Sequence, residues 1–165
     1  MDVSGFKTLF GESVRTWMDW DAVGEDNASV EDRVITERED VGELWTVWHV
    51  DPEGNPGEWS EPQNKPLQVC EAAVHDWPED RRAKIERMRE QFTDEKDEPV
   101  VMALPAYRAG DEFIVLDSNH RLIAAYLAEV PLRILAVVLD GPLSARVLPG
   151  LRHFQDQDPH AGRGH

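Results

Sequence analysis

Residues 113–138 constrain the fold more than any other part of the chain. Residues 113–116 are apolar and predict a buried strand, and residues 117–119 form a polar break. The run 122–128 contains no Pro or Gly and places apolar side chains four residues apart, as one face of a helix requires. A proline ends this helix, and residues 132–139 predict a second buried strand. The sequence therefore predicts a compact unit of strand, polar turn, helix and strand.

The polar turn carries the only dense cluster of polar side chains in this unit. The first N–H groups of a helix have no partner within the helix, and the helix dipole places partial positive charge there. Asp117, Ser118 and Asn119 can each cap the helix through the side chain. His120 adds an imidazole, and Arg121 adds a guanidinium suited to phosphate or carboxylate. The pattern indicates an anion site, and an ordinary capped helix is the alternative.

This turn is similar to that of a known family. Residues 116–125, LDSNHRLIAA, resemble the DGxHR-type turn of the ParB/sulfiredoxin-like superfamily. The match extends more loosely over residues 66–141. It is strongest at Asp117, His120, Arg121, Ala124 and Ala125. The resemblance implies a strand that runs into the turn and a helix N-terminus that holds nucleotide phosphates. The superfamily includes partition proteins that bind and hydrolyse CTP, sulfiredoxin, free-serine kinases and proteins described as nucleases.

Three positions of the turn depart from the family pattern. Ser118 stands where members usually have Gly, which bears on how closely the backbone approaches a phosphate. Asn119 stands where sulfiredoxin has its catalytic cysteine and partition proteins have an acidic residue. His120 stands where partition proteins have Arg. The resemblance thus implies phosphate binding at Ser118, Asn119, His120 and Arg121, and it does not imply sulfinic-acid reduction.

The resemblance also implies candidate catalytic groups and cofactors. A nucleotide-dependent enzyme of this family would use Mg²⁺ and a nucleoside triphosphate, either ATP or CTP. Asp117, beside His120, would hold the Mg²⁺ through the nucleotide phosphates. Glu71 would lie near the end of the first core strand, where some kinase members carry a catalytic acid. The catalytic candidates are therefore Asp117, His120 and Glu71.

The expected fold class is α+β, a small mixed sheet with helices, in three segments. Residues 1–65 are expected to be an acidic, Trp-rich β-meander extension, residues 66–141 the ParB/sulfiredoxin-like core, and residues 142–165 a short helix and a flexible tail. In the extension we expect a helix over 13–20, strands over 33–40 and 42–50, and a turn over 51–57.

In the core we expect a strand over 67–74, and then a helix that begins at Asp76 and Pro78 and runs to Phe92. A strand over 99–104 and a hairpin turn over 105–111 follow. The expected C-terminal helix covers 143–154, and a frayed tail covers 155–165.

Two further groups of side chains have alternative interpretations. The helix over 78–92 carries the only basic concentration in the chain. Its basic face is expected to be solvated and laced with ion pairs, and a contact with a nucleotide tail or an acidic substrate is the alternative. Trp45, Trp48 and Trp59 are expected to serve the core or a lid, with ligand stacking as the alternative.

Charge and cysteine content limit the partners. The formal net charge is −16, and residues 1–65 contribute about −11 of it, from 16 Asp and Glu against 5 Lys and Arg. Such a surface disfavours nonspecific binding to nucleic acid or anionic membrane and suits a basic protein partner. The single cysteine, Cys70, excludes an internal disulfide and is expected to be buried and inert. No secretion signal and no membrane-spanning run is recognised, so we expect a cytoplasmic protein.

Three function classes follow. The first is a nucleotide-dependent enzyme of kinase or NTPase type, with phosphates held at Ser118–Arg121. The second is a non-catalytic binding or regulatory module whose acidic surface docks a basic protein. The third is a nuclease, which is the least favoured because a surface of charge −16 repels nucleic acid.

Overall fold

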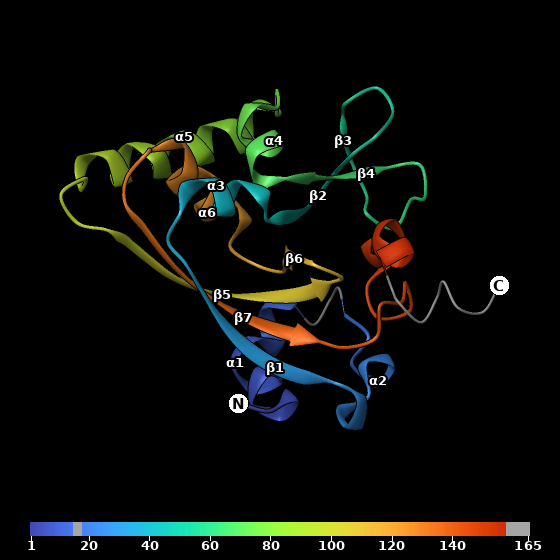
Figure 1. Cartoon of the computed structure of the whole chain (residues 1–165). Coiled ribbons are helices and arrows are strands. Elements are labelled where there is room, and N and C mark those ends of the chain that lie inside the picture. Colours follow the sequence, from blue (N-terminus) through green and yellow to red (C-terminus); the bar gives the residue numbers. More distant parts are fainter. Residues whose placement is uncertain (15–17, 158–165) are drawn as a thin grey trace.

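The computed structural model describes residues 1–14 and 18–157. In these ranges a seven-stranded mixed sheet carries helices on both faces (Figure 1), so the predicted α+β class is confirmed. The strands are β1 (Ser29–Ile35), β2 (Trp45–Val50), β3 (Pro56–Gly57), β4 (Lys65–Gln68), β5 (Val100–Ala109), β6 (Glu112–Val115) and β7 (Leu132–Asp140). The helices are α1 (Val3–Val14), α2 (Trp20–Val23), α3 (Arg38–Glu43), α4 (Val69–Val74), α5 (Glu79–Asp94), α6 (Asn119–Leu127) and the 3₁₀ segments η1 (Glu25–Asn27) and η2 (Pro149–Gln157). None of these helices is long and apolar enough to cross a membrane.

The centre of the sheet is the pair β5 and β7. The strand order is β1-β7-β5-β6-β2-β3, and β4 also pairs with β2. β5 and β7 run parallel, from Val100 opposite Leu132 to Tyr107 opposite Leu139. Parallel strands cannot be joined by a tight turn, so the chain passes from β5 through β6 and α6 before it returns as β7. This crossover fixes the N-terminus of α6 at the end of β6.

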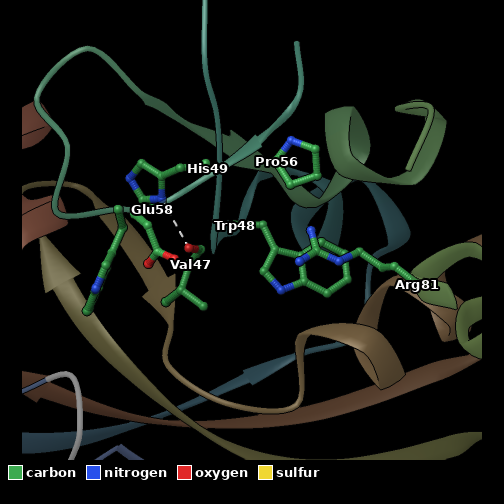
Figure 2. A pocket seen from close by; sticks show the side chains of 8 residues that line it. Val47, Trp48, His49, Pro56, Glu58 and Arg81 are labelled. Carbon is green, nitrogen blue, oxygen red and sulfur yellow. Dashed lines mark hydrogen bonds between the residues drawn. The ribbon is translucent and has the colours of Figure 1, made fainter. Parts of the chain in front are cut away.

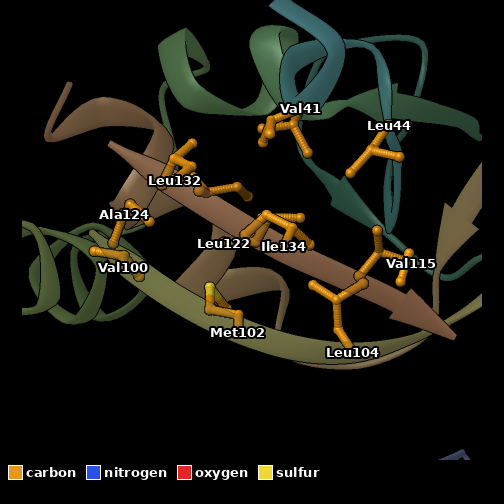
Figure 3. Close-up of a cluster of buried hydrophobic side chains, with 14 of the residues drawn as sticks. Val41, Leu44, Val100, Met102, Leu104, Val115, Leu122, Ala124, Leu132 and Ile134 are labelled. Carbon is orange, nitrogen blue, oxygen red and sulfur yellow. The ribbon is translucent and has the colours of Figure 1, made fainter. Parts of the chain in front are cut away.

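Both faces of the central strands are buried in their second halves, over residues 104–107 of β5 and 136–139 of β7. On β7, Ile134, Ala136 and Val138 belong to one hydrophobic cluster, and Val137 and Leu139 belong to another. Burial on both faces explains why residues 134–139 form a continuous apolar run in the sequence. Figure 3 shows the first cluster, which packs the sheet against α3 to α6. The second cluster packs the other face against α1, α2 and η2.

The unit predicted from residues 113–139 is confirmed as β6, α6 and β7. The preceding strand is longer than expected, because β5 continues to Ala109 through the segment predicted as a turn. Pro105 lies within this strand, opposite Val137 of β7, and its carbonyl accepts a hydrogen bond from the Leu116 N–H at 2.9 Å. The actual turn is confined to Gly110 and Asp111.

Two predicted strands are wrong over most of their length: residues 67–68 end β4 and residues 33–35 end β1, but the remainder of each segment is largely helical. The strand predicted over 67–74 becomes helix α4, which starts at Val69. Gln68 and Glu71 form a capping box at its N-terminus, and the Gln68 N–H donates to Glu71 Oε1 at 3.0 Å. The strand predicted over 33–40 is replaced by the end of β1 and by α3, whose first turn carries two acidic residues that suit the helix dipole.

The first 65 residues do not form a separate meander. β1 pairs with β7 along its whole length, from Ser29 opposite Asp140 to Ile35 opposite Ile134. β2 lies at the other side of the sheet, beside β6, and pairs antiparallel with β3 and β4. Strands from residues 1–65 and from 66–141 therefore share one sheet.

The ends of the chain also differ from expectation. Helix α1 was not predicted, and the helix predicted over 13–20 falls partly on residues 15–17, which lie outside the described residues. The helix predicted over 143–154 is instead η2, which begins at Pro149. Residues 158–165, most of the predicted tail, lie outside the described residues.

Two strained backbone positions bound helix α6. Ser118 precedes it with φ 68° and Glu129 follows it with φ 56°, and these are the non-glycine residues with positive φ in the described chain. The left-handed region costs an L-residue about 1–2 kcal/mol, a cost that glycine avoids.

We predict that Ser118→Gly and Glu129→Gly each raise the free energy of unfolding by about 1 kcal/mol, after the greater unfolded-state entropy of glycine is subtracted. Urea denaturation of the two variants measures this gain. Ser118→Ala and Glu129→Ala are the matched controls, because they remove the same side chains and keep the strain. Equal stabilities of the Gly and Ala variants would contradict the prediction.

Candidate functional site

The first turn of α6 follows Ser118, whose backbone adopts the left-handed conformation. Ser118 is the N-cap residue, with φ 68° and ψ 27°, and its side chain makes no capping hydrogen bond. Its carbonyl accepts the first helical bond, from the Leu122 N–H at 2.9 Å. The backbone thus adopts the conformation that glycine favours, although the residue is serine. Within α6, the first N–H groups point out of the helix end with the dipole behind them.

Asn119 does not point out from this turn. It is 4% exposed, and its Nδ2 donates to the Val115 carbonyl at 3.3 Å. Its Oδ1 is buried and has no hydrogen-bond partner. An unpaired buried acceptor costs free energy, so Asn119 lies in an environment that favours an additional donor.

His120 turns towards the sheet and contacts Trp48 of β2. The two ring centroids lie 4.7 Å apart, with the rings edge to face at 72°. Burial lowers the pKa of His120 to about 4, and the charges of Lys84 and Arg81 on α5 add to the effect. His120 is therefore neutral at pH 7. It can donate or accept a hydrogen bond but contributes no positive charge.

Arg81 supplies the positive charge beside His120. Its guanidinium lies 4.3 Å from the ring centroid of Trp48 and 4.6 Å from that of Trp77. The Trp77 indole is buried, and its Nε1 donates to the Ala72 carbonyl at 2.7 Å, which anchors this stack to α4. Burial lowers the pKa of Arg81, but an arginine stays protonated at neutral pH.

Trp48 and Arg81 also line a cavity of about 390 Å³. In Figure 2 they lie on one side of it, and His49 and Glu58 lie on the other. The complete lining is Val47, Trp48, His49, Pro56, Gly57, Glu58, Trp59 and Arg81. The volume falls in the range of small-molecule sites. The tryptophans were expected to serve the core or a lid: Trp45, Trp48 and Trp59 do pack against the core, and Trp48 and Trp59 also form walls of this cavity.

Arg121 points to a different part of α5. It is exposed, and its guanidinium lies 5.1 Å from the ring centroid of Phe92. Phe92 follows Arg81 by 11 residues in α5, about 16 Å along the helix axis. The structure thus brings His120 together with Trp48 and Arg81, and it directs the Arg121 side chain elsewhere. The sequence placed Arg81 on a basic helix face but gave no signal that it lies over the rings of two tryptophans in contact with each other.

The two acidic residues predicted as catalytic candidates, Asp117 and Glu71, lie in different elements. Asp117 is half-buried in the turn between β6 and α6. Glu71 is exposed on α4, where its carboxylate caps the helix, instead of lying at the end of a strand. Across residues 1–14 and 18–157, no three His, Cys, Asp or Glu side chains gather in a way that could hold a metal ion. Asp117 would therefore reach Mg²⁺ only together with ligands that a nucleotide supplies.

A second cavity, of about 750 Å³, has an acidic lining. Its charged residues are Arg33, Asp40, Glu43, Asp111 and Glu112. Cys70, the single thiol, also lines it and is only partly buried. The thiol that was expected to be buried is therefore only partly so. The four carboxylates against one guanidinium make this cavity suited to a cationic group.

Comparisons of the chain with protein-family models, with curated proteins and with solved structures find no match. The resemblance to the ParB/sulfiredoxin-like superfamily rests on the residues of the turn and on the order of β6, α6 and β7, and it stays a prediction.

The pKa of His120 makes stability depend on pH. Its pKa is about 4 in the folded chain against 6.5 for an unperturbed imidazole, so the unfolded chain binds more protons between these two values. The free energy of unfolding therefore falls as pH decreases from about 6.5 to about 4. We predict that His120→Gln reduces the loss of stability between about pH 7 and pH 5, as measured by urea denaturation.

The matching NMR experiment follows the His120 Cε1 proton, whose midpoint is expected near pH 4. A midpoint at the value of a free imidazole, together with unchanged pH dependence in His120→Gln, would refute the burial of this ring.

Proposed function

We propose that the chain is a nucleotide-binding protein that holds phosphates at the first turn of α6 and the base in the cavity beside Trp48. The observation that carries this proposal is the contact of His120 with Trp48. This contact makes the helix N-terminus and the 390 Å³ cavity neighbours. One ligand with an anionic end and a flat aromatic end can then occupy both.

The phosphate end of the proposal rests on charge and backbone shape. The left-handed conformation at Ser118 leaves the first turn of α6 without a side-chain cap. Helix N–H groups and the dipole favour an anion there. Arg81 provides a full positive charge, and the neutral His120 provides a ring nitrogen that can donate to a phosphate oxygen. Ser118, Asn119, His120 and Arg121 stay the proposed phosphate-binding residues, and Arg81 joins them. The Asn119 side chain is buried, so Asn119 would contribute its backbone N–H, and Arg121, whose side chain lies over Phe92, would act through its charge at longer range.

The base end rests on the aromatic lining. Trp48 and Trp59 present flat surfaces on which a base can stack, an interaction worth about 1–3 kcal/mol per base. Glu58 lies across the cavity from Arg81 (Figure 2) and can accept hydrogen bonds from an exocyclic amino group. This lining suits adenine and cytosine, which carry such a group, and is consistent with ATP or CTP.

The proposed activity is of kinase or NTPase type. Phosphoryl transfer depends mainly on positioning and on charge stabilisation, so it requires few protein groups of special reactivity. In this proposal Asp117 and the phosphates together hold Mg²⁺, and His120 and Arg81 stabilise charge on the transferred group. Glu71 is the candidate acid from the family resemblance, and its engagement with Gln68 makes it the weakest member of the set. The proposed location is the cytoplasm, which suits the single free thiol.

A non-catalytic module that docks a basic protein is the second candidate. The 750 Å³ cavity favours it, because Asp40, Glu43, Asp111 and Glu112 line one hollow of a chain with net charge −16. A lysine or arginine side chain of a partner fits this charge. A nuclease is not proposed, because the same charge repels nucleic acid.

The test is thermal unfolding with Mg²⁺ and each of ATP, CTP, GTP and their diphosphates. Ligand that binds only the folded state stabilises it by about 2.7 kcal/mol at 100 times its Kd, which corresponds to a Tm increase of about 5–10 °C for a chain of this size. We predict such an increase with ATP or CTP for the wild type, and its loss in Arg81→Ala.

Arg87→Ala is the matched control, since Arg87 is exposed on the same helix. It should retain the ligand-induced increase, whereas Arg121→Ala should lose only part of it. The increase is measured relative to each variant without ligand, so a change in intrinsic stability does not obscure it. If no nucleotide raises the Tm of the folded wild type, the nucleotide proposal fails. Salt-sensitive binding of a lysine-rich peptide would then support the docking module.

A further inference from the structure

We propose that His49 and His153 form a binding site for a transition-metal ion of the zinc type, with two protein ligands. This site lies beside the cavity but on the side away from α6, and it does not depend on nucleotide binding. It uses two imidazoles that the function proposed above leaves without a role.

His49 is a buried ring with one nitrogen unsatisfied. It lies in β2, is 3% exposed, and its Nδ1 donates to the Val47 carbonyl at 3.0 Å (Figure 2). Its Nε2 is buried and has no hydrogen-bond partner. With the proton on Nδ1, the Nε2 lone pair is free, which is the state in which an imidazole binds a metal.

His153 repeats this arrangement from η2. It forms a hydrogen bond with the backbone of Asn64, and its Nε2 is buried without a partner. The bond with Asn64 therefore falls on Nδ1. Metal-binding histidines commonly donate their second ring N–H to a carbonyl or carboxylate, which fixes the ring and raises its basicity. Both rings meet this condition through backbone carbonyls.

The two rings lie close enough to share an ion. Their centroids are 5.6 Å apart, and the rings are inclined at 46°. Two imidazoles that share a zinc ion at about 2.0–2.1 Å from each nitrogen have centroids about 5–6 Å apart. The observed spacing falls within this range.

Gly150 shows which edge of His49 faces η2. A Cβ atom built on Gly150 would lie 3.5 Å from Cε1 and 3.6 Å from Nε2 of His49. Side chains three residues apart in a 3₁₀ helix point the same way, so the His153 side chain leaves η2 on the face of Gly150. The Nε2 edge of His49 is thus directed at the face of η2 that carries His153.

The surrounding charges define what the site can hold. Arg152 and Lys65 are the nearby cations, and the guanidinium of Arg152 is tied to the carbonyls of Trp59 at 2.7 Å and Pro149 at 3.0 Å. Glu58 lines the cavity next to His49 and supplies negative charge. No third metal-binding side chain joins the pair within the described chain, so the remaining coordination positions are open to water or to a small ligand in the cavity. Imidazole nitrogen selects Zn²⁺ and Cu²⁺ over Mg²⁺ and Ca²⁺.

The experiment is a calorimetric titration with Zn²⁺ of the full chain in which His160→Ala and His165→Ala remove the two histidines of the C-terminal tail. The expected result is one Zn²⁺ per chain, with no comparable heat from Mg²⁺. His153→Gln in the same background should weaken Zn²⁺ binding at least about tenfold, because one of two ligands is lost. His75→Gln is the matched control and should leave the affinity unchanged, since His75 binds the Gly54 carbonyl elsewhere.

A second measurement keeps the proposal testable if His49→Gln, a change in the core, does not fold. Electron paramagnetic resonance of the chain with one equivalent of Cu²⁺ should show coupling to two nitrogens, and His153→Gln should reduce this to one. Two results would overturn the proposal. One is full Zn²⁺ affinity in His153→Gln, and the other is loss of all Zn²⁺ binding when only His160 and His165 are substituted. Absence of any Zn²⁺ binding by the folded chain would also overturn it, and would assign the two Nε2 atoms to a shared water.

Discussion

The parallel pairing of β5 and β7 is the constraint on which the rest of the structure depends. The second halves of both strands are buried on both faces, so their backbone groups must find partners in the sheet. A parallel pair requires a connection that leaves the sheet and returns, and here β6 and α6 provide it. The N-terminus of α6 therefore lies at the carboxyl end of β6, next to β2. The position of the candidate site follows from this crossover. Helices α3 to α6 cover one face of the sheet, and α1, α2 and η2 cover the other.

The sequence predicted the parts of the fold whose signal is local. β6, α6 and β7 combine strong apolar runs with a polar turn, and α5 combines an apolar face with a proline at its start. The predictions failed for α3 and α4, which are six residues each and too short for a clear helical period. The capping box of Gln68 and Glu71 was a readable local signal for α4. β1 was misplaced because it is largely exposed and charged, and only its pairing with β7 makes it a strand.

The candidate site was partly predictable for a similar reason. Asp117, Ser118, Asn119 and His120 are contiguous, so their place at a helix start follows from the turn itself. Arg81 and Trp48 come from segments far apart in the chain, and a cation that lies over two indoles is visible only after the tertiary fold is known. The same limit applies to Arg121, whose direction depends on Phe92 of α5. Sequence reasoning thus identifies groups that share a turn, whereas the partners across a cavity require the structure.

The position of β1 has a consequence for synthesis on the ribosome. β1 ends at Ile35, and its partner β7 begins at Leu132, so almost 100 residues separate the strands of this ladder. Contacts between such distant segments raise the contact order and slow folding. During synthesis on the ribosome, β1 leaves the exit tunnel early, and the backbone groups along both of its edges stay unpaired until β7 has also left the tunnel. The charged residues Glu31, Asp32 and Arg33 disfavour pairing of this strand with other chains before β7 is available, as charges on an edge strand do in folded sheets.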